Sequence, residues 1–299
     1  MTDSQMPEIC DYEGSDYRTD FWEGRGRDYE DRVERVALRR LLPPSGERLL
    51  EVGAGFGRLS RLFTGYKQVV LLDYSRSQLE YARRAYGDHG FLYVAANLYH
   101  MPFAPGVFDG AVMVRVLHHM QDPPAALRSV RDVMSEGGTF ILEFANKQNL
   151  KAIARWALRR QAWSPFEREP VEFVELNYNF HPAYVRETLR EVGFEPGRTL
   201  TVSHYRIGVL KRAVPTPVLV ALDSLAQLSG DAWQLTPSVF VRSQAAGPDE
   251  PAPAGAFWMC PACGSYEMEE QPDAITCTDC STRWLKRNGV WDFKEPVGG

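Results

Sequence analysis

Residues 49–58 read Leu-Leu-Glu-Val-Gly-Ala-Gly-Phe-Gly-Arg. The apolar run over 49–52 predicts a buried parallel strand. It ends in Gly53-x-Gly55-x-Gly57, where glycines permit positive φ angles and let a ligand lie directly against the backbone. A helix is expected from Arg58 onward, with its free N–H groups facing that ligand. This strand–turn–helix pattern indicates a nucleotide-like ligand at the glycine turn.

The glycine spacing and the next strand narrow the class of ligand. The spacing is tighter than the dinucleotide fingerprint Gly-x-Gly-x-x-Gly, and no Gly-Lys-Ser/Thr follows, so NAD binding and a P-loop are both disfavoured. A second apolar strand over 68–72 ends in Asp73, about 20 residues after the turn. A doubly wound sheet places a carboxylate there to meet ribose hydroxyls, although Asp73 could also cap the following helix.

Five stretches in order resemble the class I S-adenosylmethionine-dependent methyltransferases. They are the glycine turn, Asp73, and residues 95–103, 107–119 and 135–143. The resemblance covers roughly residues 48–145 and implies an α/β fold with a Rossmann-like, doubly wound, seven-stranded sheet. It also implies S-adenosyl-L-methionine as cosubstrate. The cofactor-binding set carried over from the matching motifs is Glu51, Gly53, Ala54, Gly55, Gly57, Asp73, Tyr74, Asn97, Leu98 and Arg115.

The resemblance extends to both ends of the cofactor. Asn97 stands where relatives commonly carry an aspartate toward the adenine amino group, and an amide oxygen can accept the same hydrogen bond. In the family, a segment before the first strand closes over the methionine end. Tyr17, Arg25 and Arg27 are therefore candidates for its carboxylate, with aromatic packing and solvated arginines as the alternative. Residues 1–15 are acidic and are expected to be loose.

Methyl transfer from a sulfonium is an in-line displacement that relies on proximity and needs few catalytic side chains. His118 and His119 follow the predicted fourth strand, over 108–114, and either could take a proton from a neutral acceptor. Each could instead merely shape the pocket. Glu143, at the end of the fifth strand (138–144), is a further candidate for orienting the acceptor, as is Arg115.

Periodicity and capping residues place the remaining elements. Helices are expected over 31–42, 76–86, from Asp122, over 182–192 and, as an amphipathic helix, over 218–228. Strands are expected over 91–95 and 200–205, with a final antiparallel one over 238–241. Residues 146–180 are predicted to form a substrate lid over the carboxyl ends of the strands.

Basic residues recur within this predicted lid. Lys147, Lys151, Arg155 and Arg159 follow one another at intervals of four, which predicts one basic stripe on a helix. The stripe could select the acceptor or could be an ordinary solvated face.

Four of the five cysteines follow a linker, rich in proline, alanine and glycine, over 244–255. The pairs Cys260-x-x-Cys263 and Cys277-x-x-Cys280 have the spacing typical of four thiolates that close tetrahedrally on zinc. Thioredoxin-like chemistry would need one such pair on a helix inside a βαβ unit. Four ligands leave no open position, so the zinc is predicted to be structural and to fold a ribbon over 256–299.

Residues 284–293 resemble the end of the small zinc-ribbon proteins that activate certain methyltransferases of tRNA, ribosomal RNA or release factors. Residues 256–299 nevertheless carry four Lys/Arg against seven Asp/Glu, whereas a module that reads RNA is expected to be basic. The ribbon is therefore interpreted as an internal stabilising or substrate-shaping module.

Composition sets the remaining bounds. The net charge of −5 lacks the positive excess expected of a nucleic-acid-binding protein, and no apolar run is long enough for a transmembrane helix. The polar N-terminus does not resemble a signal peptide, and the paired cysteines favour metal binding over secreted disulfides, so a cytoplasmic location is predicted. The predicted organisation is an N-terminal cap over 1–47, a methyltransferase domain over 48–243, the linker and the ribbon.

The function predicted from these features is S-adenosylmethionine-dependent methyl transfer to a small-molecule acceptor. One alternative is a tRNA or ribosomal RNA methyltransferase that uses the basic stripe and the ribbon. The other is a non-catalytic, cofactor-binding scaffold, which the intact glycine turn and Asp73 disfavour.

Overall fold

The computed structural model describes residues 7, 9, 11–15, 22 and 26–297. The strands are β1 (Gly46–Val52), β2 (Tyr66–Asp73), β3 (Phe91–Ala95), β4 (Phe108–Met113), β5 (Met134–Ala145), β6 (Val171–Val174), β7 (Asn177–Asn179), β8 (Phe194–Val202), β9 (Ser238–Ala245), β10 (Met268–Glu270), β11 (Ala274–Cys277), β12 (Arg283–Arg287) and β13 (Val290–Asp292). The α-helices are α1 (Asp28–Leu41), α2 (Arg76–Tyr86), α3 (Pro123–Val133), α4 (Leu150–Ala157), α5 (Pro182–Glu191), α6 (Gly208–Ala213) and α7 (Thr216–Ala226). Short 3₁₀ turns are η2 (Ser60–Phe63), η3 (Leu98–His100), η4 (Leu117–His119) and η5 (Gln227–Asp231).

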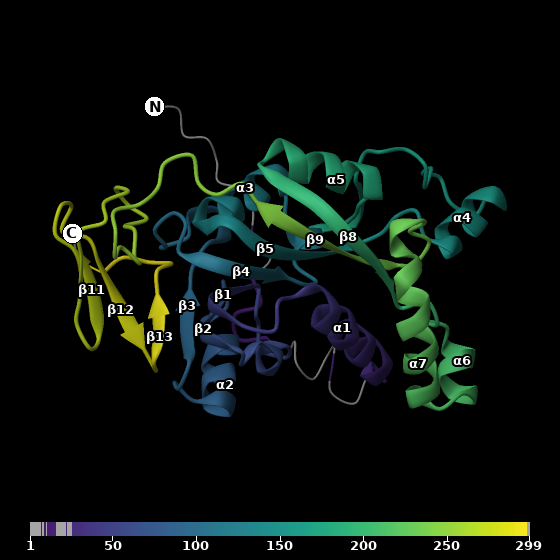
Figure 1. Cartoon of the computed structure of the whole chain (residues 1–299), viewed down its shortest axis with the longest axis horizontal. Coiled ribbons are helices and arrows are strands. Elements are labelled where there is room, and N and C mark those ends of the chain that lie inside the picture. The colour runs from purple at the N-terminus through teal and green to yellow at the C-terminus, as the bar shows by residue number, and fades with distance from the viewer. Residues whose placement is uncertain (1–6, 8, 10, 16–21, 23–25, 298–299) are drawn as a thin grey trace.

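The predicted doubly wound α/β fold is confirmed. Among the described residues, eleven strands form one sheet in the order β10-β11-β12-β13-β3-β2-β1-β4-β5-β9-β8 (Figure 1). The run from β3 to β8 is the predicted seven-stranded sheet. Strands β1 to β5 pair in parallel, and β9 runs antiparallel between β5 and β8. The carboxyl ends of the parallel strands therefore meet at one edge, where doubly wound sheets bind their ligands.

Helices cover both faces of the sheet, and each face has its own apolar core. Leu50 and Val52 of β1 face a core with α3 and α5, whereas Leu49 faces a core with α1, α2 and α7. Figure 1 shows α3 and α5 on one side of the sheet and α1 and α2 on the other. Because helices cover both faces, the last four residues of β1, 49–52, are all buried, Glu51 included.

The cysteine-rich ribbon is an extension of the main sheet. Strand β13 pairs in parallel with β3, with Trp291 opposite Val94 and Asp292 opposite Ala95. The ring of Trp258 also stacks on Phe103, with centroids 5.7 Å apart. Figure 1 shows the ribbon at the end of the molecule beside β3. The pairing covers the edge of β3, whose backbone would otherwise be open to association with other chains.

Several sequence predictions need correction. The helix expected after the glycine turn is only the 3₁₀ turn η2, because β2 already begins at Tyr66 and leaves no room for a longer one. The strand expected over 200–205 is β8, over Phe194–Val202. The linker expected from residue 244 starts later, since Gln244 and Ala245 still pair with β8.

The helix predicted to be amphipathic, α7, has an unusual distribution of side chains. Leu222 and Leu225 are exposed, whereas Asp223 is buried. The carboxylate of Asp223 accepts hydrogen bonds from the hydroxyl of Tyr29 at 2.5 Å and from the backbone N–H of His204 at 2.8 Å. No helix in the part of the chain that the structure describes has both the length and the apolar character needed to cross a membrane.

The prediction of one basic stripe on a helix is wrong. Asn149 caps α4, so Lys147 lies before the helix, where it is buried and donates from Nζ to the carbonyl of Glu169 at 2.7 Å. The helix ends at Ala157, and Arg159 follows with a φ of +54°. Only Lys151 and Arg155 of the four lie on α4.

Candidate functional site

A cavity lies at the carboxyl edge of the sheet, against the glycine turn. Its wall includes six residues of the predicted cofactor-binding set: Gly53, Gly55, Asp73, Tyr74, Leu98 and Arg115. Gly53 and Gly55 have φ angles of +64° and +53°. A side chain at Gly53 would clash with Val116, whereas nothing lies within 4 Å of where a Cβ at Gly55 would stand. The backbone at Gly55 is therefore open to close approach by a ligand.

The carboxylate of Asp73, in the wall of this cavity, is held in place by two backbone N–H groups. One of its carboxylate oxygens accepts the backbone N–H of Gly55 at 2.7 Å, and the other accepts that of Ser75 at 2.8 Å. Burial raises the pKa of Asp73 to about 6, and the nearby carboxylates of Asp11 and Glu13 act in the same direction. The helix cap is Ser75, whose hydroxyl accepts from the backbone N–H of Gln78, so Asp73 is not the cap of α2.

An N-terminal strap, residues 9 and 11–15, covers the cavity. Ile9 and Tyr12 contribute to its wall. The Glu13 carboxylate accepts from the first backbone N–H groups of α2, those of Arg76 at 2.8 Å and Ser77 at 3.1 Å. Sequence reasoning missed this strap and expected a loose segment. The pairing of Glu13 with a helix start more than sixty residues away leaves no local signal in the sequence.

A second cavity adjoins the first and shares Val52, Gly53, Gly55 and Arg115 with it. Glu51 and Ala54 of the predicted set line it. The Glu51 carboxylate accepts the hydroxyl of Ser60 at 2.5 Å, and burial raises its pKa to about 7. Gly57 lies in neither wall within the described residues. There a side chain would collide with the ring of Tyr86, so this glycine is required for packing.

Arg115 belongs to a buried ion cluster between α1 and the glycine turn. Its Nε donates to one carboxylate oxygen of Glu34 at 2.9 Å, and Nη2 of Arg58 donates to the other at 2.7 Å. Both guanidinium groups lie over the ring of Trp22, Arg58 at 3.8 Å and Arg115 at 5.0 Å from its centroid. Although burial opposes it, these two cations hold the pKa of Glu34 below its ordinary value.

The two predicted catalytic histidines occupy different environments. His119 lines the first cavity; its Nδ1 lies 3.0 Å from the carbonyl oxygen of Leu176, and its Nε2 lies 3.4 Å from the hydroxyl of Tyr12. Because a carbonyl only accepts, Nδ1 carries the proton, and the lone pair of Nε2 accepts from the hydroxyl of Tyr12. Burial lowers the pKa of His119, so it is neutral at neutral pH. The loop of Leu176 joins β6 to β7, inside the predicted lid.

Three further predicted residues that the structure describes, His118, Glu143 and Asn97, lie outside the two cavity walls. The half-buried ring of His118 lies beside that of His119, and its buried Nδ1 has no hydrogen-bond partner among the described residues. Glu143 is buried and accepts from the backbone N–H of Arg115 at 2.8 Å and the hydroxyl of Ser238 at 2.6 Å. The amide oxygen of Asn97 accepts the backbone N–H of Tyr99 at 2.8 Å. Tyr17 and Arg25 lie outside the described residues.

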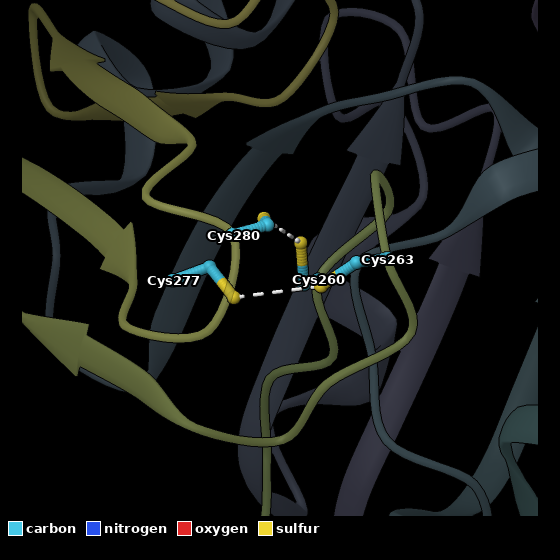
Figure 2. Close-up of side chains that lie close together, drawn as sticks. All are labelled: Cys260, Cys263, Cys277 and Cys280. Atoms are coloured by element: carbon cyan, nitrogen blue, oxygen red, sulfur yellow. Dashed lines mark hydrogen bonds between the residues drawn. The ribbon is translucent and has the colours of Figure 1, made fainter. Parts of the chain in front are cut away.

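The four paired cysteines form a compact sulfur cluster (Figure 2). Their Sγ atoms all lie within 4.8 Å of one another, with 3.6 Å separating Cys260 from Cys280 and Cys263 from Cys277. Tetrahedral zinc holds thiolates at about 2.3 Å, which places the sulfurs about 3.8 Å apart. The cluster therefore has the geometry and the donor chemistry of a closed metal site.

Comparison with known proteins agrees with this geometry. Residues 50–142 match the Methyltransferase domain family. A Mesorhizobium loti S-adenosylmethionine-dependent methyltransferase has the same fold, with a TM-score of 0.52 at 22% identity over 71% of this chain and 97% of that one. The family match therefore covers residues 50–142, and the structure shares its fold with a solved S-adenosylmethionine-dependent methyltransferase.

Two curated relatives extend the comparison. The O-methyltransferase cnsE of Penicillium expansum is 29% identical over 151 residues, which cover 47% of this chain and 55% of that protein. The ubiquinone/menaquinone biosynthesis C-methyltransferase UbiE of Haemophilus ducreyi is 35% identical over 109 residues, which cover 33% and 42%. The chain thus spans about half the length of the curated relatives it matches.

Proposed function

We propose that this protein transfers a methyl group from S-adenosylmethionine to a small-molecule acceptor. The observation that carries the proposal is the pair of adjoining cavities on the glycine turn, with Asp73 in one and Glu51 in the other. Burial raises the pKa of both carboxyl groups, so each gains from a ligand that brings donors or positive charge. S-adenosylmethionine brings ribose hydroxyls, a sulfonium and an ammonium group.

Each end of the cofactor has residues suited to hold it. The Asp73 carboxylate suits the ribose hydroxyls, and Tyr74 and Leu98 offer apolar contact to the adenine. Glu51 suits the ammonium group, and Arg115 stands at the junction of the two cavities. The cofactor supplies a methyl group on a good leaving group, so orientation is the main task of the protein.

We assign the proton acceptor to Nε2 of His119. An acceptor hydroxyl or amine that attacks the methyl carbon loses its proton to this nitrogen, while the methyl–sulfur bond breaks and its electron pair stays on sulfur. The hydrogen bond from Nδ1 to the Leu176 carbonyl fixes the required tautomer. Support for a small acceptor comes from the named O-methyltransferase relative and from the β6–β7 hairpin beside the cavity.

We further propose that the four cysteines hold a structural zinc ion. Four sulfur ligands complete a tetrahedral shell and leave no position for substrate. This metal and the pairing of β13 with β3 together stabilise the ribbon.

Cofactor binding tests the first proposal. By isothermal titration calorimetry, S-adenosylmethionine should bind the wild type with micromolar affinity, and Gly55→Arg should abolish binding. Asp73→Asn should weaken binding about 10- to 100-fold, which corresponds to the free energy of one hydrogen bond to a charged group. Asp109→Asn is the matched control, because Asp109 also accepts two backbone N–H groups, those of Glu47 and Arg48, but outside both cavities. A wild-type titration without heat of binding would overturn the proposal in favour of the scaffold.

A survey of methyl acceptors tests the proposed class of acceptor and the role of His119. Purified enzyme and methyl-labelled S-adenosylmethionine, added to extract of the source organism lacking the gene, should label the small-molecule fraction. His119→Gln should lower the rate at saturating cofactor about 100-fold or more, whereas His89→Gln, at an exposed histidine, should leave it unchanged. Label that accumulates in RNA instead would contradict the small-molecule proposal and favour an RNA methyltransferase.

A further inference from the structure

A third cavity lies at the far end of the same sheet edge. Its wall comes from three segments: α4 with its cap, residues 201–207 at the end of β8, and residues 226–237 from the end of α7 to the start of β9. Its volume is about 770 Å³, within the usual range for small-molecule sites. Figure 1 shows α4, α6 and α7 grouped at the end of the molecule opposite the ribbon. Within the described residues it shares no wall residue with the two cofactor cavities.

Ser203, in the wall of this cavity, carries an unsatisfied polar group. Its side chain is only 1% exposed, and its Oγ has no hydrogen-bond partner among the described residues. Its φ of +69° is a left-handed conformation that a non-glycine residue adopts only when the surrounding structure holds it there. A buried hydroxyl without a partner is unfavourable, because folding removes its hydrogen bonds to water without replacing them. A ligand with a polar atom at this wall would satisfy it.

The charged groups in the wall are cationic. Lys151 forms no ion pair among the described residues, and Nε of Arg155 donates to the neutral side chain of Gln161 at 3.1 Å. Arg206 shares the carboxylate of Glu30, at 3.6 Å, with the ammonium group of Lys211. No aspartate or glutamate stands in the described wall. The cavity therefore has an excess of positive charge that an anionic group would neutralise.

Large apolar side chains stand beside these cations. Leu150 is 63% exposed, Trp233 63% and Ile207 54%, and all three line the cavity. Exposed apolar surface gathered around a concave site is typical of ligand-binding grooves. Cations alone would suit a polar anion such as phosphate, but these neighbours also require an apolar body.

We propose that this third cavity binds an amphiphilic anion. Its apolar chain or ring lies on Leu150, Ile207 and Trp233, and its carboxylate or phosphate meets the cations of Lys151 and Arg155, while Ser203 supplies a hydrogen bond. The proposal goes beyond methyl transfer and does not depend on it. Nucleic acid fits less well, because the apolar rim gives the phosphate backbone no contact and the predicted basic stripe is not formed.

Calorimetry with dodecyl phosphate, kept below its micelle concentration, tests the site. We expect micromolar binding, at least tenfold tighter than dodecanol, and no measurable binding of inorganic phosphate. The double variant Lys151→Glu/Arg155→Glu should lose at least tenfold in affinity. The matched control Arg159→Glu/Arg160→Glu makes the same charge change just beyond α4, outside the cavity wall, and should stay within twofold of the wild type.

A second variant, Ser203→Gly, tests the site even if the double variant Lys151→Glu/Arg155→Glu fails to fold. Ser203→Gly removes the hydroxyl and suits the positive φ angle, so the protein should fold and bind dodecyl phosphate severalfold more weakly. Equal losses in both double variants, or equal affinity for dodecyl phosphate and dodecanol, would overturn the proposal. Binding to phosphatidylglycerol vesicles or RNA, equally weakened by both double variants and without binding of monomeric dodecyl phosphate, would overturn it in favour of a basic surface contact.

Discussion

Cys277→Ser is expected to unfold the ribbon and to lower the melting temperature by on the order of 10 °C or more. Cys277 is fully buried in the sulfur cluster, and the loss of one thiolate opens the proposed zinc site; in comparable small domains such a metal contributes many kcal/mol of folding free energy. The same result is expected when a chelator strips the metal. Differential scanning calorimetry and zinc analysis of the purified protein measure the two effects together.

The effect should extend beyond the ribbon. Once β13 leaves the edge of β3, Phe103 loses its stacking partner Trp258, and Arg76 loses its 2.9 Å ion pair with Asp292. Lys294, just after β13, lies 3.3 Å from the carboxylate of Glu13 in the N-terminal strap. Cofactor affinity should therefore fall with the ribbon.

The control for this experiment is Cys10→Ser, which removes the fifth cysteine and leaves the four clustered sulfurs in place. It should melt within about 1 °C of the wild type. A wild-type protein that contains far less than one zinc per chain after expression in metal-replete medium, or a Cys277→Ser variant that melts like the wild type, would show that the ribbon does not depend on metal.

The parts of the fold that follow from local patterns could be predicted from sequence. The structure has α2 over Arg76–Tyr86 and β3 over Phe91–Ala95, the spans expected from their caps and apolar runs. The cysteine pairs likewise come together as their spacing predicts. In each case the signal lies within about 20 residues, so no knowledge of tertiary contacts is needed.

The features that depend on distant contacts could not be predicted in this way. The interval of four between the basic residues does not reveal that Lys147 turns inward to Glu169. The pairing of β13 with β3 joins segments almost two hundred residues apart. The third cavity assembles Lys151, Ser203 and Trp233 from three separate stretches, and no sequence pattern connects the three.

Glu34→Gln should destabilise the protein by about 3 kcal/mol, because it removes the buried carboxylate that the partly buried guanidinium groups of Arg58 and Arg115 share, although Arg58 keeps its ion pair with Asp31. Chemical denaturation measures this loss. The cations hold the pKa of Glu34 below its ordinary 4.5, so the cluster stabilises the fold above about pH 4.5 and loses strength as the pH falls through the lowered pKa. The deficit of the variant should therefore be full at neutral pH and shrink in acid.

The consequence for the site follows from the position of Arg115. This residue lines both cofactor cavities, and its guanidinium group is fixed by Glu34 and lies over Trp22. Once released, it no longer defines the junction of the two cavities, so affinity for S-adenosylmethionine should fall along with stability.

Asp28→Asn is the matched control on the same helix. It breaks the ion pair between Asp28 and Arg32, whose side chains are 57% and 50% exposed respectively. The free energy of unfolding should therefore change by no more than about 0.5 kcal/mol. If Glu34→Gln is as stable as this control, the ion cluster does not hold α1 to the glycine turn. If the variant loses stability but binds the cofactor as well as the wild type, the cluster supports the fold without shaping the site, because the position of Arg115 then makes no difference to the ligand.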